Sequence, residues 1–416
     1  MRPAAALRRR LVLGSMAGPL LAPWGAPGAA ASSGSSATSA GAATSATSTA
    51  PPTPATPATT ARSAAAPPAP ADGVRRGRAL VFPRDHGAHP DTRTEWWYTT
   101  GWLGSETSPT HGFQVTFFRS RTGLAADSGS RFAARQILFA HAAITDLGAR
   151  RHRHASVIAR WNGDPRARPD FASLDDASLA IGRWWLRREA AGPSSARDRW
   201  RARVQGHDFE LALDLERTQP LLLQGDAGFS RKGPDERQAS HYYSEPQLQA
   251  GAALAVDGGS GTAPPDGRAW IDHEWSDEIL HPDAVGWDWT GINLFDGSAL
   301  TAFVLRRRDG STLWAGGSFR APGQAARIFG ADELRLEPGR RWRSPQTGAS
   351  YPVQWQLHTP AGRWELRSLM DAQELDSRGS TGTVYWEGLS ELLDGGGRRV
   401  GLGYLEMTGY AGALRL

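Results

Sequence analysis

From about residue 78 onward, the chain consists of short runs of apolar, aromatic and β-branched residues separated by turn-forming Gly, Pro, Asn and Asp. The run at 95–103 is typical, because its aromatic and threonine side chains suit a pleated, half-buried surface. No segment sustains a helical period, so the pattern predicts an all-β sandwich or barrel. The strands expected in the first half are 78–83, 95–103, 112–120, 134–146, 152–161, 179–188, 199–205, 208–216 and 221–224.

The second half repeats this organisation after a Gly- and Pro-rich stretch at 258–267. Tight-turn dipeptides at 296–297 and 309–310 mark hairpins, and little helix is expected. The segments 97–119 and 289–306 also share a weak pattern of Trp, Gly and Leu followed by an apolar run, which favours two barrels of one kind. The strands expected here are 285–295, 299–307, 312–319, 351–359, 363–369, 382–392 and 400–408.

The densest group of chemically active residues is at 270–275, and 286–291 repeats its pattern of an acid between aromatic residues. On a strand, His273 and Trp275 would face one way while Asp272 and Glu274 face the other. This arrangement is suitable for the floor of a pocket. The alternative is a strand whose tryptophans belong to the core and whose acids bind loop amides.

Two further positions allow a functional and a structural interpretation. His141 interrupts an apolar strand, and a hydrogen-bonded core histidine is favoured over a functional one. Tyr243, in the segment 241–244, could line a site or cap the end of a strand. The interior of a barrel with about eight to ten strands either packs solid or holds one small ligand, and aromatic walls favour an apolar ligand.

The N-terminal region has the organisation of an exported protein. Residues 1–31 contain Arg8, Arg9 and Arg10, a short apolar run and small residues, which predicts a twin-arginine-type signal peptide. Residues 32–74 are rich in Ala, Ser, Thr and Pro and predict a disordered linker. Folded domains are then expected at 75–265 and 266–416, without a transmembrane segment in the mature chain.

Composition narrows the possible functions. The 416 residues include 47 basic and 42 acidic ones, and removing four arginines in the first ten lowers the net charge from +5 to +1, which argues against nucleic-acid binding. The absence of cysteine excludes disulfides, thiolate catalysis and Cys-based zinc sites. Lys232 is the only lysine, which leaves little place for phosphate-loop chemistry. The histidines lack a metal-binding spacing, so neither a metal nor a cofactor is expected.

Five motifs, at 95–98, 270–275, 286–291, 385–388 and 403–410, resemble the lipocalin-like family that unites secreted AttH-type proteins with carotenoid 1,2-hydratases. The resemblance covers about residues 78–411. It implies two lipocalin-like (calycin) barrels in tandem, often labelled predicted secreted hydrolases, and a possible association with an ABC-type permease complex. From the hydratase branch, the His-x-Trp pattern carries over to His273 and Trp275. Asp288 is the acid in a comparable setting, although tryptophans flank it where the branch has tyrosine.

Two functions fit these residues. The preferred one is binding of an apolar, lipid- or isoprenoid-like small molecule in the periplasm or outside the cell. The site would lie near the domain junction, where His273, Trp275 and Asp288 are expected to meet. Its ligand-binding residues would be Trp96, Trp97, Tyr98, Tyr243, Trp287 and Trp289.

The alternative is a hydratase that needs no cofactor. Asp288 or Asp272, kept protonated by burial, would protonate a carbon–carbon double bond, and His273 would hold and deprotonate the water. Trp275 and Trp287 would stabilise the cation, by about 2 kcal/mol in a dry site. A hydrolase is the third possibility, but the chain contains no Gly-x-Ser-x-Gly motif.

Overall fold

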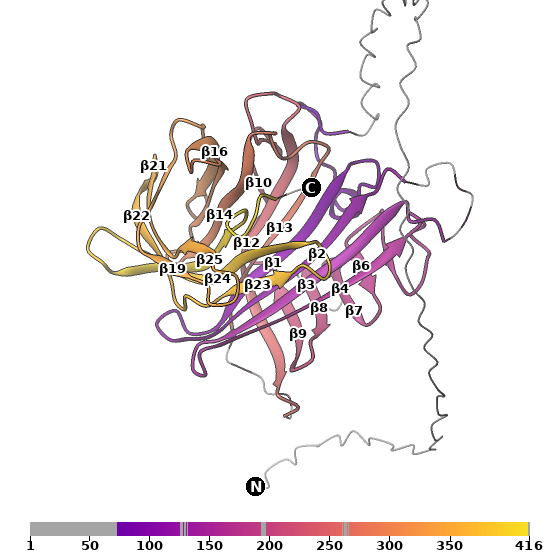
Figure 1. Ribbon diagram of the computed structural model, residues 1–416, viewed down its shortest axis with the longest axis horizontal. Coiled ribbons are helices and arrows are strands. Elements are labelled where there is room, and N and C mark those ends of the chain that lie inside the picture. Colours follow the sequence, from indigo (N-terminus) through magenta and orange to yellow (C-terminus); the bar gives the residue numbers. More distant parts are fainter. Residues whose placement is uncertain are drawn as a thin grey trace, which may run out of the picture. The chain divides into compact units, whose positions relative to one another are not determined.

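Apart from one short helical turn, the regular elements of the described chain are strands in antiparallel pairs, as the alternating pattern predicts (Figure 1). The computed structural model describes residues 73–414, except 125–127, 129, 131, 193–196, 260, 262–263 and 265. The expected signal peptide, and the expected linker up to residue 72, lie outside the described residues. The only helix in the described part is a single 3-10 turn, η1 (Arg84–His86), and no helix there is long and apolar enough to cross a membrane.

The first sheet has thirteen strands, and its main path runs β4-β3-β2-β1-β13-β12-β9-β8-β7-β6-β5. Its two ends approach each other where β3 and β4 contact β6, so the sheet is nearly closed into a barrel. Its strands are β1 (Thr94–Gly104), β2 (Pro109–Arg121), β3 (Gln136–Asp146), β4 (Arg151–Trp161), β5 (Phe171–Ala172), β6 (Ser178–Ile181), β7 (Trp184–Glu189), β8 (Arg199–Gln205), β9 (Phe209–Glu216), β10 (Leu222–Leu223), β11 (Phe229–Arg231), β12 (Ala239–Val256) and β13 (Gly267–Ser276).

The second sheet has ten strands, with the main path β17-β16-β15-β14-β25-β24-β22-β21-β18. Its strands are β14 (Ala284–Leu294), β15 (Ala299–Arg307), β16 (Thr312–Arg320), β17 (Arg327–Phe329), β18 (Arg335–Pro338), β21 (Gln354–Thr359), β22 (Gly362–Ser368), β23 (Glu374–Ser377), β24 (Thr383–Leu393) and β25 (Arg399–Met407). A separate hairpin joins β19 (Arg341–Arg343) and β20 (Ser350–Pro352).

The passage from one sheet to the other differs from the expected boundary after residue 265. β13 lies between β1 and β12 and pairs with both, so it belongs to the first sheet. The chain therefore enters the second sheet only between β13 and β14. The Gly- and Pro-rich stretch before β13 connects two neighbouring strands of one sheet, which is why composition alone misplaces the change of sheet.

Two strands expected from the sequence, 78–83 and 179–188, are not formed as predicted. Residues 78–83 form no strand and lead into η1, while 179–188 is a hairpin of β6 and β7 with a turn at Gly182. The longest strand, β12, follows from none of the expected runs. It contains Pro246 and a register shift between Glu245 and Leu248, which obscure the alternating pattern.

Side-chain alternation gives β1 two buried faces. Trp97 and Leu103 belong to the core inside the first sheet, whereas Tyr98 and Trp102 belong to a separate core between the two sheets. The sheets approach closely at Gly112 of β2, where an added Cβ would lie 2.7 Å from the Tyr404 hydroxyl. The described residues from 73 onward all belong to one compact unit, so the space between the sheets lies within a single folded body.

Candidate functional site

A cavity of about 700 Å³ lies between the two sheets. One wall comes from the outward faces of β1, β2, β3 and β13, and the opposite wall from β14, β15, β24 and β25. The segment 277–284, which connects the sheets, contributes to the rim. This volume is within the range of about 300–1,000 Å³ that is typical of small-molecule sites.

Aromatic side chains form much of both walls. Trp96 of β1 and Trp287 of β14 are half-buried and nearly parallel, with ring centroids 6.5 Å apart and an interplanar angle of 15°. Tyr98 contacts Trp289 edge-on at 5.2 Å, and Phe118 stacks on Phe139 at 4.6 Å. Such walls favour an apolar or planar ligand.

Carboxyl groups occupy the interior of the same cavity. Asp272 accepts hydrogen bonds from the Ser244 hydroxyl (2.6 Å), the Tyr242 hydroxyl (2.7 Å) and the Trp270 indole N–H (2.7 Å). Burial raises the pKa of Asp272 to about 7, although the three donors favour the ionised form. Asp272 therefore changes charge near neutral pH.

Glu387 of β24 and Glu406 of β25 are paired directly across their strands and line the cavity. The Tyr98 hydroxyl donates to Glu387 Oε1, while Oε2 has no hydrogen-bond partner although the residue is only 1% exposed. Burial and the neighbouring Glu406 hold the pKa of Glu387 well above its ordinary value. Burial also raises the pKa of Glu406 to about 7, against a hydrogen bond from the Trp287 indole. Both carboxyl groups therefore retain a proton more readily than an exposed glutamic acid does.

Lys232 adds the one buried ammonium group among the residues that line the cavity. Its Nζ lies 2.9 Å from Glu274 Oε1, which makes an ion pair. The same Nζ lies 4.1 Å from the ring centroid of Phe303 and 4.7 Å from that of Tyr242. The wall thus already accommodates an alkylammonium group through a carboxylate and two aromatic faces.

His141 also reaches the cavity, so it is more than a core residue. Its Nδ1 is 2.7 Å from the Tyr385 hydroxyl and its Nε2 is 3.0 Å from Ser380 Oγ. Burial lowers the pKa of His141 to about 3. So weak a base would not activate a serine effectively, and this pair gives no support to a hydrolase.

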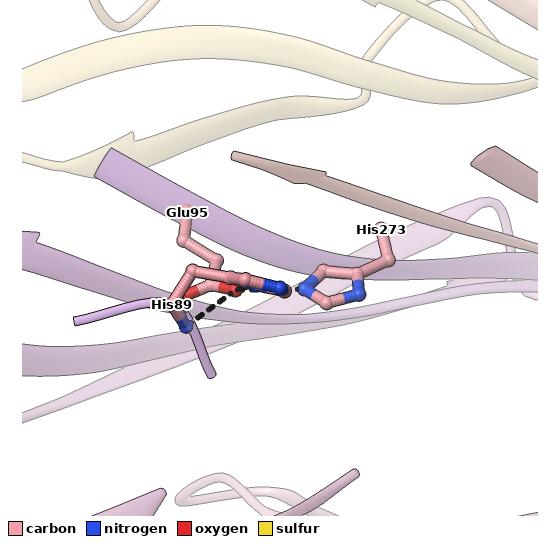
Figure 2. A group of neighbouring side chains, drawn as sticks. All are labelled: His89, Glu95 and His273. Atoms are coloured by element: carbon pink, nitrogen blue, oxygen red, sulfur yellow. Dashed lines mark hydrogen bonds and ion pairs between the residues drawn. The ribbon is translucent and has the colours of Figure 1, made fainter. Parts of the chain in front are cut away.

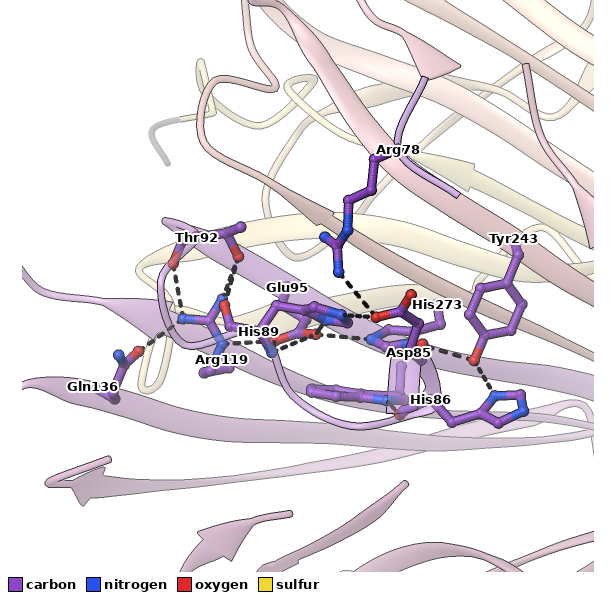
Figure 3. Close-up of polar contacts among 11 residues, drawn as sticks. Arg78, Asp85, His86, His89, Thr92, Glu95, Arg119, Gln136, Tyr243 and His273 are labelled. Carbon is purple, nitrogen blue, oxygen red and sulfur yellow. Dashed lines mark hydrogen bonds and ion pairs between the residues drawn. The ribbon is translucent and has the colours of Figure 1, made fainter. Parts of the chain in front are cut away.

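The opposite face of β13 lies inside the first sheet and carries a polar network. Glu95 Oε1 is 2.7 Å from His89 Nδ1 and 2.9 Å from His273 Nε2 (Figure 2). Arg119 Nε donates to Glu95 Oε2 at 2.7 Å, and the other nitrogen of His89 is 2.9 Å from Asp85 (Figure 3). The two ring nitrogens of His89 thus contact two different carboxyl groups. The cationic neighbours hold the pKa of Glu95 well below its ordinary value, although burial opposes this shift.

The network continues towards Tyr243, whose hydroxyl lies 3.2 Å from His273 Nδ1 and 2.6 Å from His86 Nδ1 (Figure 3). Burial lowers the pKa of His273 to about 4, so its ring is neutral. Trp97 stacks on His273 with centroids 4.5 Å apart, and Trp275 stacks on His89 at 3.8 Å. These rings are fully buried and do not line the cavity.

One group of three side chains in the described part of the chain has the spacing of a metal site. It consists of His89, Glu95 and His273, whose possible metal-ligating atoms all lie within 4.8 Å of one another. Their ligand atoms are already hydrogen-bonded to each other, and Arg119 holds the second oxygen of Glu95. A divalent cation would have to displace these bonds next to a guanidinium. The donor set therefore fits a hydrogen-bonded network better than a metal centre.

Asp288 points into the core of the second sheet. Its Oδ2 is 2.6 Å from Arg306 Nε, and the Tyr410 hydroxyl donates to Oδ1 at 3.1 Å. Burial raises the pKa of Asp288 to about 6 despite Arg306. On the same strand, Trp287 and Trp289 face the cavity.

The structure therefore separates the predicted site residues. Asp272, Trp96, Tyr98, Trp287 and Trp289 line the cavity. The expected common pocket of His273, Trp275 and Asp288 is not formed, because alternation directs them to the interiors of two different sheets. Trp97 and Tyr243 also lie inside the first sheet, away from the cavity.

Sequence reasoning missed Glu387, Glu406 and Lys232. Both glutamates belong to the motifs at 385–388 and 403–410, and side-chain alternation directs them to the opposite face from their neighbours Trp386 and Met407, which belong to the core of the second sheet. For each strand taken separately, this alternation is enough to predict which face carries the glutamate. Their direct pairing depends on the register of β24 with β25, which the sequence does not give.

The fold and cavity define an all-β, lipocalin-like protein with a cavity between its two sheets. The chain matches the AttH-like family over residues 73–410 and belongs to that family. It is similar to the crystal structure of a protein described as AttH from Nitrosomonas europaea, with 43% identity over 81% of this chain and 99% of that one, and a TM-score of 0.72.

A second solved structure shares the fold alone. Kievitone hydratase from Nectria haematococca is 13% identical over 80% of this chain and 94% of its own, with a TM-score of 0.58. No curated protein matches the chain.

Proposed function

We propose that the protein binds an apolar small molecule with a polar end in the cavity between the two sheets. The observation that carries this proposal is a cavity of about 700 Å³ whose walls are aromatic and whose interior holds carboxyl groups. Burial of apolar surface at about 25 cal/mol per Å² is sufficient for useful affinity. The carboxyl groups would then orient the polar end.

The test measures binding of Nile red, a neutral apolar dye, by its fluorescence. Ala284→Trp fills part of the cavity and is expected to weaken binding by roughly tenfold or more. Ala325→Trp, at an exposed position outside the cavity, is the matched control. If Ala284→Trp does not fold, Leu280→Trp at the rim replaces it. Equal affinity in the cavity variant and the control would refute the proposal.

A second function, hydration of a carbon–carbon double bond, is favoured by Glu387. Burial raises the pKa of this carboxyl well above its ordinary value, and the group lines the cavity with one oxygen that has no hydrogen-bond partner. Its proton would pass to one carbon, water would add to the cation at the other, and the proton released by the water would return to the carboxylate. The fold of kievitone hydratase is compatible with this chemistry.

A substitution at Glu387 separates the two functions. Glu387→Gln keeps the shape of the side chain and removes its acidic proton. For a bound alkene, the hydratase predicts that the wild-type protein forms a product heavier by one water and that the variant forms none. Equal dye affinity in both proteins would show that the cavity remains intact. No product from the wild-type protein across a panel of alkenes would leave binding as the function.

We also propose that residues 1–31 direct export to the periplasm or beyond, where an ABC-type permease complex is a candidate partner. The paired arginines Arg8 and Arg9 support the proposal. Replacing both with lysine is expected to retain the full-length protein in the cytoplasm. Unchanged export of that variant would contradict a twin-arginine route, and co-purification from the native membrane tests the permease.

A further inference from the structure

The residues lining the cavity carry an excess of acidic groups. Two basic side chains, Arg93 and Lys232, stand against six acidic ones. Lys232 is already paired with Glu274 at 2.9 Å. The six acidic residues are Asp272, Glu274, Asp277, Glu278, Glu387 and Glu406.

Three of these acids line the cavity and form no ion pair within the described part of the chain. Asp272 is held by Ser244, Tyr242 and Trp270, and Glu406 by Trp287, all of which are neutral donors. Glu387 has one neutral donor, Tyr98, and a buried oxygen without a partner. Glu387 and Glu406 lie directly opposite each other on neighbouring strands, where two ionised carboxylates would repel each other. A positive charge bound beside them would favour the ionised form of both groups.

An organic cation fits this cavity better than a metal ion. In the described part of the chain, the cavity carboxyls form no group of three whose oxygens lie within 4.8 Å of one another. The surrounding aromatic faces, Trp96, Trp287 and Trp289, suit an ammonium group instead. Lys232 shows the arrangement already, since its Nζ sits 4.1 Å from the Phe303 ring and 2.9 Å from Glu274.

We propose that the ligand of this cavity is a cationic amphiphile, whose ammonium end binds among Glu387, Glu406 and Asp272 and whose apolar part lies against the tryptophans. The proposal rests on the proposed binding function and specifies its ligand class. A fatty acid is disfavoured because its carboxylate would add a further negative charge to the site. An alcohol of the same length would gain the apolar contacts without the charge.

The proposal makes binding dependent on pH. Asp272 and Glu406, with pKa values of about 7, ionise as the pH rises through neutrality, and the affinity for an ammonium group rises with them. The groups that face the three acids from the surrounding elements are Tyr98, Lys232, Tyr242, Glu274, Tyr385 and Tyr404. Lys232 and Glu274 form an ion pair, and the tyrosines remain neutral because burial raises the pKa of each.

The experiment compares decylammonium, decanol and decanoate by titration calorimetry on the folded protein. Decylammonium is expected to bind roughly tenfold more tightly than decanol, and decanoate more weakly than either. Between about pH 6 and about pH 8, the affinity for decylammonium should rise, with protons released on binding, while that for decanol stays constant. Glu406→Gln should reduce the preference for the amine, and Glu337→Gln, an exposed position outside the cavity, should not.

The outcomes distinguish the two proposals. Binding of decanol or decanoate as tight as that of decylammonium would overturn the cationic ligand class and leave the binding function standing. Binding of none of the three, together with no binding of Nile red, would overturn the binding function itself. A variant that does not fold is replaced by Asp272→Asn, for which the same loss of preference is expected.

Discussion

Glu387 on β24 and Glu406 on β25 stand directly opposite each other and both face the cavity. Two carboxylates in this position would repel each other, so at least one remains protonated at neutral pH. The pair therefore links the stability of the fold to pH and to the charge of whatever enters the cavity.

The first prediction concerns the pH dependence of Glu406→Gln. Burial raises the pKa of Glu406 to about 7, so its stabilising contribution is complete below its ordinary pKa and is lost as the pH rises through about 7. Glutamine has no such loss. The melting temperature of the variant, relative to wild type, should therefore be higher at about pH 8.5 than at about pH 5.5. A constant difference across this range would contradict the raised pKa.

Glu95→Gln tests the network inside the first sheet. The substitution removes the charge that Arg119, His89 and His273 share, and leaves a buried cation without its partner. We expect a loss of about 3–5 kcal/mol in the free energy of unfolding, measured by urea denaturation. Glu337→Gln, on the exposed strand β18, should change it by less than about 0.5 kcal/mol.

Asp288→Asn separates a structural from a ligand-binding role. Asp288 pairs with Arg306 in the core of the second sheet and does not line the cavity. The variant should lose about 3 kcal/mol of stability while its affinity for Nile red at low temperature stays within a factor of about two. A large loss of dye affinity in a folded variant would place Asp288 at the site after all.

Replacing one of the two parallel tryptophans at the cavity tests whether the aromatic wall contributes to ligand binding. Trp96 and Trp287 are half-buried and pack at the edge of the core between the two sheets. Trp287→Leu should weaken Nile red binding by roughly tenfold and cost little stability. Trp185→Leu, at a half-buried tryptophan of β7 away from the cavity, is the matched control. Equal effects of the two substitutions would argue against an aromatic binding wall.

Much of the fold could be predicted from the sequence, because strand alternation is a local property. The run at 95–103 became β1, 199–205 and 299–307 became β8 and β15, and the two faces of β13 were assigned correctly. The all-β class and the AttH-like family are confirmed. The local pattern did not predict β12, where Pro246 and a register shift obscure the alternation, or the short turn that divides β6 from β7.

The site was harder to predict because it depends on which sheet faces meet. His273 and Trp275 form part of a dense motif, yet their partners are Glu95 and His89, far away in sequence and in the same sheet interior. Asp272 was placed correctly on the other face, but its companions Glu387 and Glu406 come from strands more than a hundred residues later. Only the register and the packing of two sheets bring them together.

The two faces of β13 also have a consequence for engineering. His273 and Trp275 take part in the network inside the first sheet, whereas Asp272 and Glu274, on the opposite face of the strand, line the cavity. Substitutions at positions 272 and 274 could therefore change which ligand the cavity prefers. They would leave the side chains of the network inside the first sheet unchanged, because those side chains come from the other face of β13.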